Sequence, residues 1–218
     1  MKRLSTGRHL STGRRARRAL VALFAAGTLL LGACSNGGSD ASSDTPSFTG
    51  ARINADQRYV PAPRPLVATS GGERTLAGDA DVTLVFFGYT HCPDICGAVL
   101  GNIASAMNRL SDAERERVEV LFVTTDPARD DVKTLRDYLK RYDPEFEGLT
   151  GSLEDLSAVA ESMKVYFAEG TKLPSGGYEV EHNDHVVGLD SEGLGAVVWT
   201  RETSSATLAS DIQSLLAG

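Results

Sequence analysis

Two cysteines, Cys92 and Cys96, are four residues apart in the sequence THCPDIC (residues 90–96), directly after an apolar run. On a helix, side chains at this spacing share one face, so both sulfurs can point at one atom or at each other. One bound metal ion or one disulfide bond could therefore engage both residues. Only three residues separate the thiols, so a disulfide here would remove little entropy from the unfolded chain. A chemical role is favoured over a structural bridge.

The first 33 residues predict an export signal. Residues 1–18 contain seven Lys and Arg residues and no acidic residue. A short apolar stretch follows and ends in Leu-Gly-Ala-Cys34. This ending resembles the lipobox of bacterial lipoproteins, which makes Cys34 the expected lipidation site. A free thiol or a disulfide partner at Cys34 is the less favoured alternative. The expected location is extracytoplasmic, lipid-anchored at the outer face of the cytoplasmic membrane, with the Sec or twin-arginine route left open.

The composition also limits the partners. The whole chain has a net charge of −7, and removal of residues 1–33 leaves 22 − 7 = 15 basic and 29 acidic residues, a net charge of −14. Such a surface disfavours nucleic acid and anionic substrates and is compatible with cationic partners. Residues 34–50 are mostly Ser, Gly, Asp and Thr and predict a flexible tether. Residues 51–218 are long enough for one domain with a proper core.

Hydropathy predicts the elements that position the thiols. Residues 82–89 form a continuous apolar run typical of a central strand buried on both faces, and a helix with Pro93 in its first turn follows at the thiols. The other expected elements are a short edge hairpin in 59–75, a strand at 118–124, a helix started by Thr125-Asp126-Pro127, a helix with apolar positions from 153 to 167, a loop at 169–177, strands at 178–189 (one interrupted or two short) and 195–200, and a last helix from Ser204 or Ser205 to Leu216.

Alternation of strand and helix, followed by a late hairpin and helix, predicts an α/β thioredoxin-like fold. In this architecture a central mixed sheet is flanked by helices, and here an N-terminal β-hairpin is added. The two cysteines come at the end of the first core strand.

Four sequence blocks together resemble the SCO/SenC family of thioredoxin-like copper proteins, which are used in building the binuclear copper centre of cytochrome c oxidase. The blocks are FFGYTHCPDIC (86–96), FVTTDPARD (122–130), GLTG (148–151) and a histidine that follows an acidic residue near the late hairpin. The resemblance implies a copper site formed by Cys92, Cys96 and one histidine. Soft thiolates favour Cu(I), with Cu(II) also possible.

The choice of histidine is between His182 and His185. The family pattern has an acid-histidine pair just before the hairpin strand, and Glu181-His182 fits it by position, which assigns the ligand to His182. His185 is three residues out of that register and is expected at a strand edge or beside the ligands. His91 is expected to point away from the site. Asp94 is expected either to orient a ligand or to compensate the helix N-terminus.

Two further positions match the family block, and two depart from the family pattern. Asp126 and Arg129 belong to the Asp-Pro-x-Arg block, for which a helix cap and a surface ion pair are a sufficient explanation. Gly97 stands where a proline commonly follows the second cysteine, and Glu181 replaces the usual aspartate. Neither departure removes a ligand, although the glycine could loosen the start of the helix.

The leading functional hypothesis is a membrane-anchored metallochaperone that delivers copper to the copper-binding subunit of cytochrome c oxidase. The alternative is a thiol-disulfide oxidoreductase in which Cys92 and Cys96 are the catalytic redox pair and keep the copper-ligand cysteines of a partner reduced. Either role implies a thiol reductant as a second partner. A peroxidase ranks last, because neither Arg74 nor Arg129 is adjacent to Cys92 in sequence.

Overall fold

The computed structural model describes residues 48–172 and 177–217, apart from the side chains of residues 169 and 171, and these residues belong to one compact unit. The predicted export signal, Cys34 and most of the predicted tether lie outside the described residues. Within the described residues, no helix is both long enough and apolar enough to span a membrane.

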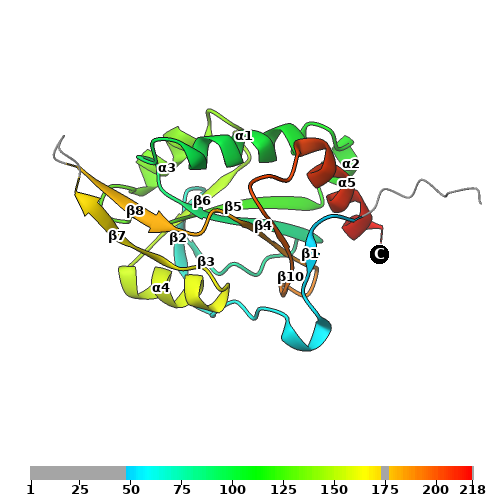
Figure 1. The fold of residues 1–218 in the computed structure, drawn as a ribbon, viewed down its shortest axis with the longest axis horizontal. Helices are drawn as coiled ribbons and strands as arrows, with labels where there is room; N and C mark the ends of the chain where they lie inside the picture. Colours follow the sequence, from blue (N-terminus) through cyan, green and yellow to red (C-terminus); the bar gives the residue numbers. More distant parts are fainter. Residues whose placement is uncertain (1–47, 173–176, 218) are drawn as a thin grey trace, which may run out of the picture. The chain divides into compact units, whose positions relative to one another are not determined.

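The core of the domain is an eight-stranded mixed sheet in the order β1-β10-β9-β4-β5-β6-β2-β3, with a separate two-stranded sheet, β7-β8 (Figure 1). β4 pairs in parallel with β5, and β5 in parallel with β6, whereas β9 runs antiparallel to β4. The strands are β1 Ala51–Arg52, β2 Leu66–Ala68, β3 Glu73–Arg74, β4 Val82–Gly88, β5 Val118–Thr124, β6 Glu147–Thr150, β7 Phe167–Lys172, β8 Tyr178–His182, β9 Val186–Leu189 and β10 Gly195–Trp199.

Helices cover both faces of the sheet (Figure 1). Ser111, Asp131, Ser152 and Ser204 each accept a hydrogen bond from a first-turn amide, which caps α2, α3, α4 and α5. The helices are α1 Ile95–Met107, α2 Asp112–Arg115, α3 Val132–Leu139, α4 Leu153–Ser162 and α5 Ser205–Leu216, with a short 3₁₀ helix at Ala55–Gln57.

Strand β4 lies in the middle of the sheet because both of its faces are apolar. Successive side chains of a strand point to opposite faces. Leu84 and Phe86 belong to the core cluster that also contains buried residues of α1, α3 and α5, whereas Val85 and Phe87 belong to the cluster with buried residues of α4. Every residue of β4 is buried, as the continuous apolar run predicts.

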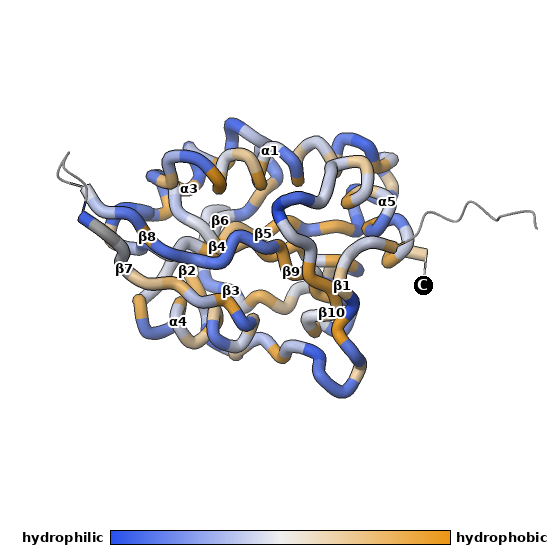
Figure 2. Tube along the Cα trace, viewed as in Figure 1, coloured by the Kyte–Doolittle hydropathy of each residue, from blue (hydrophilic) through white to orange (hydrophobic). Residues whose placement is uncertain are grey.

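The thioredoxin-like α/β fold predicted from the sequence is confirmed, as are most of its elements. The N-terminal hairpin is β2-β3, which extends the sheet beyond β6. The segment 178–189 forms two short strands that lie in different sheets, because β8 pairs with β7 and β9 pairs with β4 and β10. Figure 2 shows hydrophilic residues from the end of β8 to the start of β9 and apolar residues on β9 itself.

Two predicted helix starts are wrong. α1 begins at Ile95 with Asp94 as its N-cap residue, so Cys92 precedes the helix and only Cys96 lies on it. α3 begins at Val132 and is capped by Asp131, whose carboxylate accepts a 2.7 Å hydrogen bond from the Thr134 amide. Asp126 and Pro127 lie in the preceding loop, because the Asp126 side chain has other partners there.

The predicted apolar face of α4 is too long at its C-terminal end. The helix ends at Ser162, and Lys164 has a positive φ of 58°, which breaks the helical path. Phe167 therefore starts strand β7, in the segment that the sequence predicts as the end of the helix and a loop. Local apolar spacing could not distinguish a longer helix from a helix followed by a strand.

The start of the domain is tied to its end by the carboxylate of Asp211, which is 1% exposed. It accepts hydrogen bonds from the amides of Thr49 and Gly50 at 3.1 and 2.8 Å and from the indole Nε1 of Trp199 at 2.8 Å. Residues 48–50, at the end of the predicted tether, are thus bound to α5 and β10.

We predict that Asp211→Ala lowers the free energy of unfolding by about 2–4 kcal/mol, because it leaves the buried indole and two amides without their acceptor. Urea denaturation followed by Trp199 fluorescence measures this change. Asp137→Ala, at an exposed position of α3, is the control and should leave the urea midpoint almost unchanged. Equal midpoints for Asp211→Ala and the parent chain would contradict this role.

Candidate metal centre

The two thiols are brought together where β4 ends and α1 begins. Cys96 is fully buried on the first turn of α1, and Cys92 is partly exposed in the loop before it. The end of β4 must lack a side chain here, since a Cβ added to Gly88 would lie 2.9 Å from the Cys96 sulfur and 3.0 Å from Phe122. Gly88 thus allows the second thiol to sit directly against the sheet.

The thiolate of the pair is assigned to Cys92. Its sulfur lies 3.4 Å from the amide nitrogen of Cys96, which donates to it at the start of α1. A hydrogen bond from the Cys96 thiol, helped by the backbone amides of Cys96 and Asp94, lowers the pKa of Cys92 to about 3 against the opposing effect of burial. The same pairing, with burial, raises the pKa of Cys96, which keeps its proton.

The imidazole of His182 completes the site from the two-stranded sheet β7-β8. His182 is the last residue of β8, and its Nε2 lies 3.4 Å from the Cys96 sulfur. Its Nδ1 lies 2.7 Å from the carbonyl oxygen of Asn183, which selects the tautomer with a proton on Nδ1. The lone pair of Nε2 is then directed toward the thiols, as metal ligation requires.

The donor set fits a soft metal ion. The Cys92 and Cys96 sulfurs and a ring nitrogen of His182 all lie within 4.8 Å of one another, the only such cluster of His, Cys and acidic residues among residues 48–172 and 177–217. Bonds of about 2.0–2.3 Å require ligand atoms within about 4.6 Å of one another, so at most a small adjustment brings all three onto one ion. Two thiolates and an imidazole suit Cu(I).

The site opens into a hollow of about 300 Å³. Tyr89 forms one wall, with its ring centroid 5.9 Å from that of His182. Four acidic residues line the same hollow, which makes its mouth electronegative: Asp94, Glu179, Glu181 and Asp184. A metal donor or acceptor can reach Cys92 and His182 through this mouth, whereas Cys96 is not among its lining residues.

The remaining sequence candidates lie around the site and not in it. His185 is outside the cluster of three, and burial lowers its pKa. The His91 side chain is 55% exposed, with Nδ1 3.0 Å from the Thr90 hydroxyl. Asp94 is the N-cap residue of α1, but its side chain makes no capping hydrogen bond, and it lines the hollow instead.

The cap and surface ion pair expected for Asp126 and Arg129 are an incomplete description. Asp126 is 3% exposed and pairs with Arg129, but it also accepts a 2.7 Å hydrogen bond from the Tyr178 hydroxyl. Sequence reasoning also missed Asp130, which is fully buried and accepts from the amide and hydroxyl of Thr90. A signal was available in the sequence, because Asp130 is the last residue of the family block 122–130, which begins in a strand.

Gly97, where the family commonly has proline, is explained by a contact of this chain. A Cβ at this position would lie 2.9 Å from the hydroxyl oxygen of Tyr142. The Tyr142 ring in turn packs against Tyr138, with centroids 5.4 Å apart. The glycine therefore makes room for a tyrosine beside the first turn of α1.

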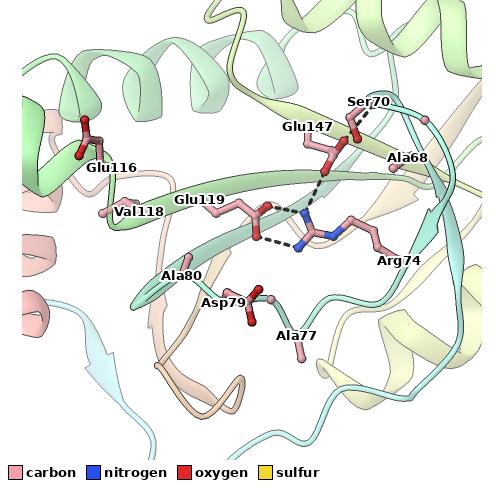
Figure 3. Close-up of a pocket in the computed structure, with 12 residues that line it drawn as sticks. Ala68, Ser70, Arg74, Ala77, Asp79, Ala80, Glu116, Val118, Glu119 and Glu147 are labelled. Carbon is pink, nitrogen blue, oxygen red and sulfur yellow. Dashed lines mark hydrogen bonds and ion pairs between the residues drawn. The ribbon is translucent and has the colours of Figure 1, made fainter.

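A larger hollow, of about 780 Å³, lies elsewhere on the domain and is lined by no cysteine or histidine (Figure 3). Its centre is Arg74, which pairs with Glu119 and, at 2.9 Å, with Glu147. These contacts connect β3, β5 and β6 and use the charge of Arg74. The hollow is therefore explained as an ion-pair network at the sheet edge, in which both partners of Arg74 are carboxylates.

The SCO1/SenC family model matches residues 63–217, which include both cysteines, the Asp126–Asp130 block and His182. The chain belongs to the SCO1/SenC family. A Sco protein from Danio rerio, the mitochondrial SCO2 homologue, is 35% identical over 132 residues, which is 60% of this chain and 47% of that protein. The chain spans about half the length of the curated relatives it matches.

Solved Sco structures share the fold. The structure of Bradyrhizobium japonicum ScoI with copper bound has a TM-score of 0.65 at 28% identity, over 72% of this chain and 99% of that one. BsSco, described as a member of the Sco family of cytochrome c oxidase assembly proteins and as having a disulfide switch, has a TM-score of 0.59 at 22% identity, over 78% of this chain and 98% of that one. At that identity the likeness to BsSco shows the fold alone.

The pKa of Cys92 predicts an unusual pH profile for alkylation by iodoacetamide. Thiolates are the reactive form, so an ordinary thiol reacts about tenfold faster per pH unit up to its pKa of about 8.5. Cys92 is already ionised above about pH 3. In a metal-free chain carrying Cys34→Ser, its rate should stay nearly constant from pH 5 to pH 8.

Cys96→Ala is the matched control, because it removes the thiol that donates to Cys92. The pKa of Cys92 should rise in this variant and its profile should move to higher pH. Mass spectrometry of the modified peptide measures both rates. A tenfold rise per pH unit from pH 5 to pH 8 in the parent protein would contradict the assignment of the thiolate.

Proposed function

We propose that this chain is an extracytoplasmic, membrane-anchored protein that binds copper through Cys92, Cys96 and His182. It delivers the ion for assembly of the binuclear copper centre of cytochrome c oxidase, and its recipient is the copper-binding subunit of that enzyme. The observation that carries the proposal is the convergence of two sulfurs and a ring nitrogen of His182 within 4.8 Å of one another. Copper in the related ScoI structure and membership of the SCO1/SenC family support it.

The environment of the site suits transfer of a cationic cargo. Cu(I) coordinated by three ligands leaves room for an incoming thiolate or imidazole of the recipient to attach before Cys92 and His182 dissociate. The acidic side chains around the mouth favour approach of a positively charged partner surface and steer it to the site. Cys96 is buried and stays in place, while Cys92 is partly exposed.

A second candidate function is supported by the unequal exposure of the same thiols. The partly exposed Cys92 can attack a partner disulfide, and the Cys96 sulfur, which lies within 4.8 Å of the Cys92 sulfur, can resolve the mixed disulfide. The partner then gains two thiols, while Cys92 and Cys96 form a disulfide that a thiol reductant must reduce again. Copper binding and this disulfide exclude one another, because the disulfide removes both thiolate ligands.

Anaerobic titration with Cu(I), in competition with a chromogenic Cu(I) chelator, tests the ligand set. The full-length chain carrying Cys34→Ser should bind one ion, and Cys92→Ala or Cys96→Ala should abolish tight binding. His182→Ala should weaken binding about 100-fold or more, because an imidazole ligand is lost. His185→Ala is the control and should bind as the parent does. Unchanged affinity in His182→Ala would remove His182 from the ligand set.

The same variant separates the two candidate functions. Thiol-disulfide exchange needs only the two sulfurs, so His182→Ala should reduce a model disulfide within about twofold of the parent rate. An assay of copper transfer to the soluble copper domain of an oxidase should instead lose most of its rate. Transfer at the parent rate by His182→Ala would favour the oxidoreductase.

The proposed anchor has its own test. Export and lipidation are inferred from residues 1–34 alone, and Cys34 is the residue that would carry the lipid. When the gene is expressed in a bacterium with a lipoprotein pathway, the parent chain should be found in the membrane fraction and incorporate labelled fatty acid. Cys34→Ser should do neither, while Cys92→Ser, the control, should do both. A labelled Cys34→Ser chain would contradict this anchor.

A further inference from the structure

The two halves of the candidate copper site are not joined by any strand pairing. Cys92 and Cys96 follow β4 of the eight-stranded sheet, whereas His182 ends β8, which pairs only with β7. A two-stranded hairpin is marginally stable on its own, so pairing with β7 alone would leave the imidazole poorly positioned. Some other contact must hold β8 against the thiol loop.

One loop, residues 125–131 between β5 and α3, contacts both halves. On the thiol side, the carboxylate of Asp130 is fully buried. It accepts hydrogen bonds from the Thr90 amide at 3.0 Å, the Thr90 hydroxyl at 2.6 Å and the Thr124 hydroxyl at 2.7 Å. Thr90 lies two residues before Cys92, so Asp130 fixes the backbone that enters the thiol loop.

On the histidine side, the same loop holds Tyr178, the first residue of β8. The Tyr178 hydroxyl donates to Asp126 at 2.7 Å, and the Tyr178 carbonyl accepts from Arg129 at 3.2 Å. The guanidinium carbon of Arg129 lies 3.9 Å from the centre of the Tyr178 ring, and Arg129 is also paired with Asp126. Tyr178 is thus held by its hydroxyl, its carbonyl and its ring.

Because Tyr178 and His182 belong to the same strand, the contacts that hold Tyr178 also restrict the position of His182. Tyr178, Val180 and His182 alternate along β8 and share one face of the strand. Val180 is buried in the same core cluster as Cys96, so the strand between the anchor and the ligand is packed against the domain. Fixing Tyr178 therefore limits the positions that His182 can take.

The burial of the carboxylates argues for a specific role of this loop. Asp126 and Asp130 are 3% and 0% exposed, and a buried carboxylate costs free energy that a well-packed apolar residue would avoid. The two carboxylates make directional contacts to two separate segments, which apolar residues could not do. Directional contacts of this kind fix one distance between the segments.

We propose, on the basis of the copper site inferred above, that residues 125–131 set the separation between the thiols and the imidazole. Asp130 positions the thiol loop through Thr90, and Asp126 with Arg129 positions His182 through Tyr178. None of these residues belongs to the cluster of three potential ligands. They are positioning residues, and each acts through a different half of the site.

Tyr178→Phe tests whether Asp126 and Arg129 position His182 through Tyr178, because it removes one hydroxyl and keeps the ring over Arg129. In the full-length chain carrying Cys34→Ser, it should weaken Cu(I) binding about tenfold, since the hairpin spends less time in the binding arrangement. Tyr166→Phe, at a 64% exposed tyrosine next to β7, is the matched control and should bind as the parent does.

A double-mutant cycle with His182→Ala shows whether the tyrosine acts through the imidazole. In the His182→Ala background, Tyr178→Phe should have no further effect on Cu(I) affinity, because the group that it positions is gone. An equal tenfold loss in both backgrounds would overturn the assignment of Tyr178 to His182, since a general loss of stability would produce that result.

Thr90→Val tests whether Asp130 positions the thiol loop through Thr90, and it is a smaller change than removal of the buried Asp130. It should weaken Cu(I) binding in the parent and by the same factor in the His182→Ala background, because Asp130 acts through the thiols. Loss of this effect in the His182→Ala background, or parent affinity in Thr90→Val, would overturn the claim that Asp130 positions the thiols through Thr90. Circular dichroism melting confirms that each variant is folded.

Hydrogen exchange of the metal-free chain gives a readout that does not depend on copper. Amides of Val180 and His182 should exchange about tenfold faster in Tyr178→Phe than in the parent or in Tyr166→Phe. Unchanged exchange would overturn the anchorage of β8. If the parent chain failed to bind Cu(I) while this exchange effect held, the proposed copper function would fail and the positioning of His182 by the loop would stand.

Discussion

The site depends on a 3.4 Å approach between the Cys96 sulfur on α1 and Nε2 of His182 at the end of β8, two residues that are 86 positions apart in sequence. Thiols alone could form a disulfide or bind many soft metals. The imidazole adds a third donor and a fixed direction. The fold therefore has to solve one geometric problem, which is to hold the end of β8 over the junction of β4 and α1.

Several features of the domain contribute to that solution. The buried strand β4 gives the thiol loop a rigid base, and Gly88 leaves room for the Cys96 sulfur. The start of α1 stabilises a thiolate on Cys92 through its first amides. Contacts of residues 125–131 to Thr90 and Tyr178 then relate the base to β8. Rigid packing lies below the site, and an open, acidic mouth lies above it.

Family membership and the geometry of this chain answer different questions. Membership in the SCO1/SenC family and the copper in a related structure indicate which ion to test. The unequal exposure of the two thiols is compatible with both proposed functions, because Cys92 is accessible and Cys96 is protected, whereas His182 is required only by the proposed copper binding. The negative charge around the hollow indicates the kind of partner that fits, because acidic residues there favour a cationic partner surface.

The sequence by itself determined the strand-helix order, the thiol pair and the histidine that joins it, because apolar periodicity and the family blocks are local signals. It did not determine where α1 and α3 start: α1 begins two residues after Pro93, and the Asp126 carboxylate, the expected cap of α3, instead accepts from Tyr178, which is distant along the chain. Nor did it reveal that β7 and β8 form their own sheet, or that Asp130 and Tyr178 support the two halves of the site. Those features are contacts between segments distant along the chain, and only the packed tertiary structure decides which distant polar groups meet.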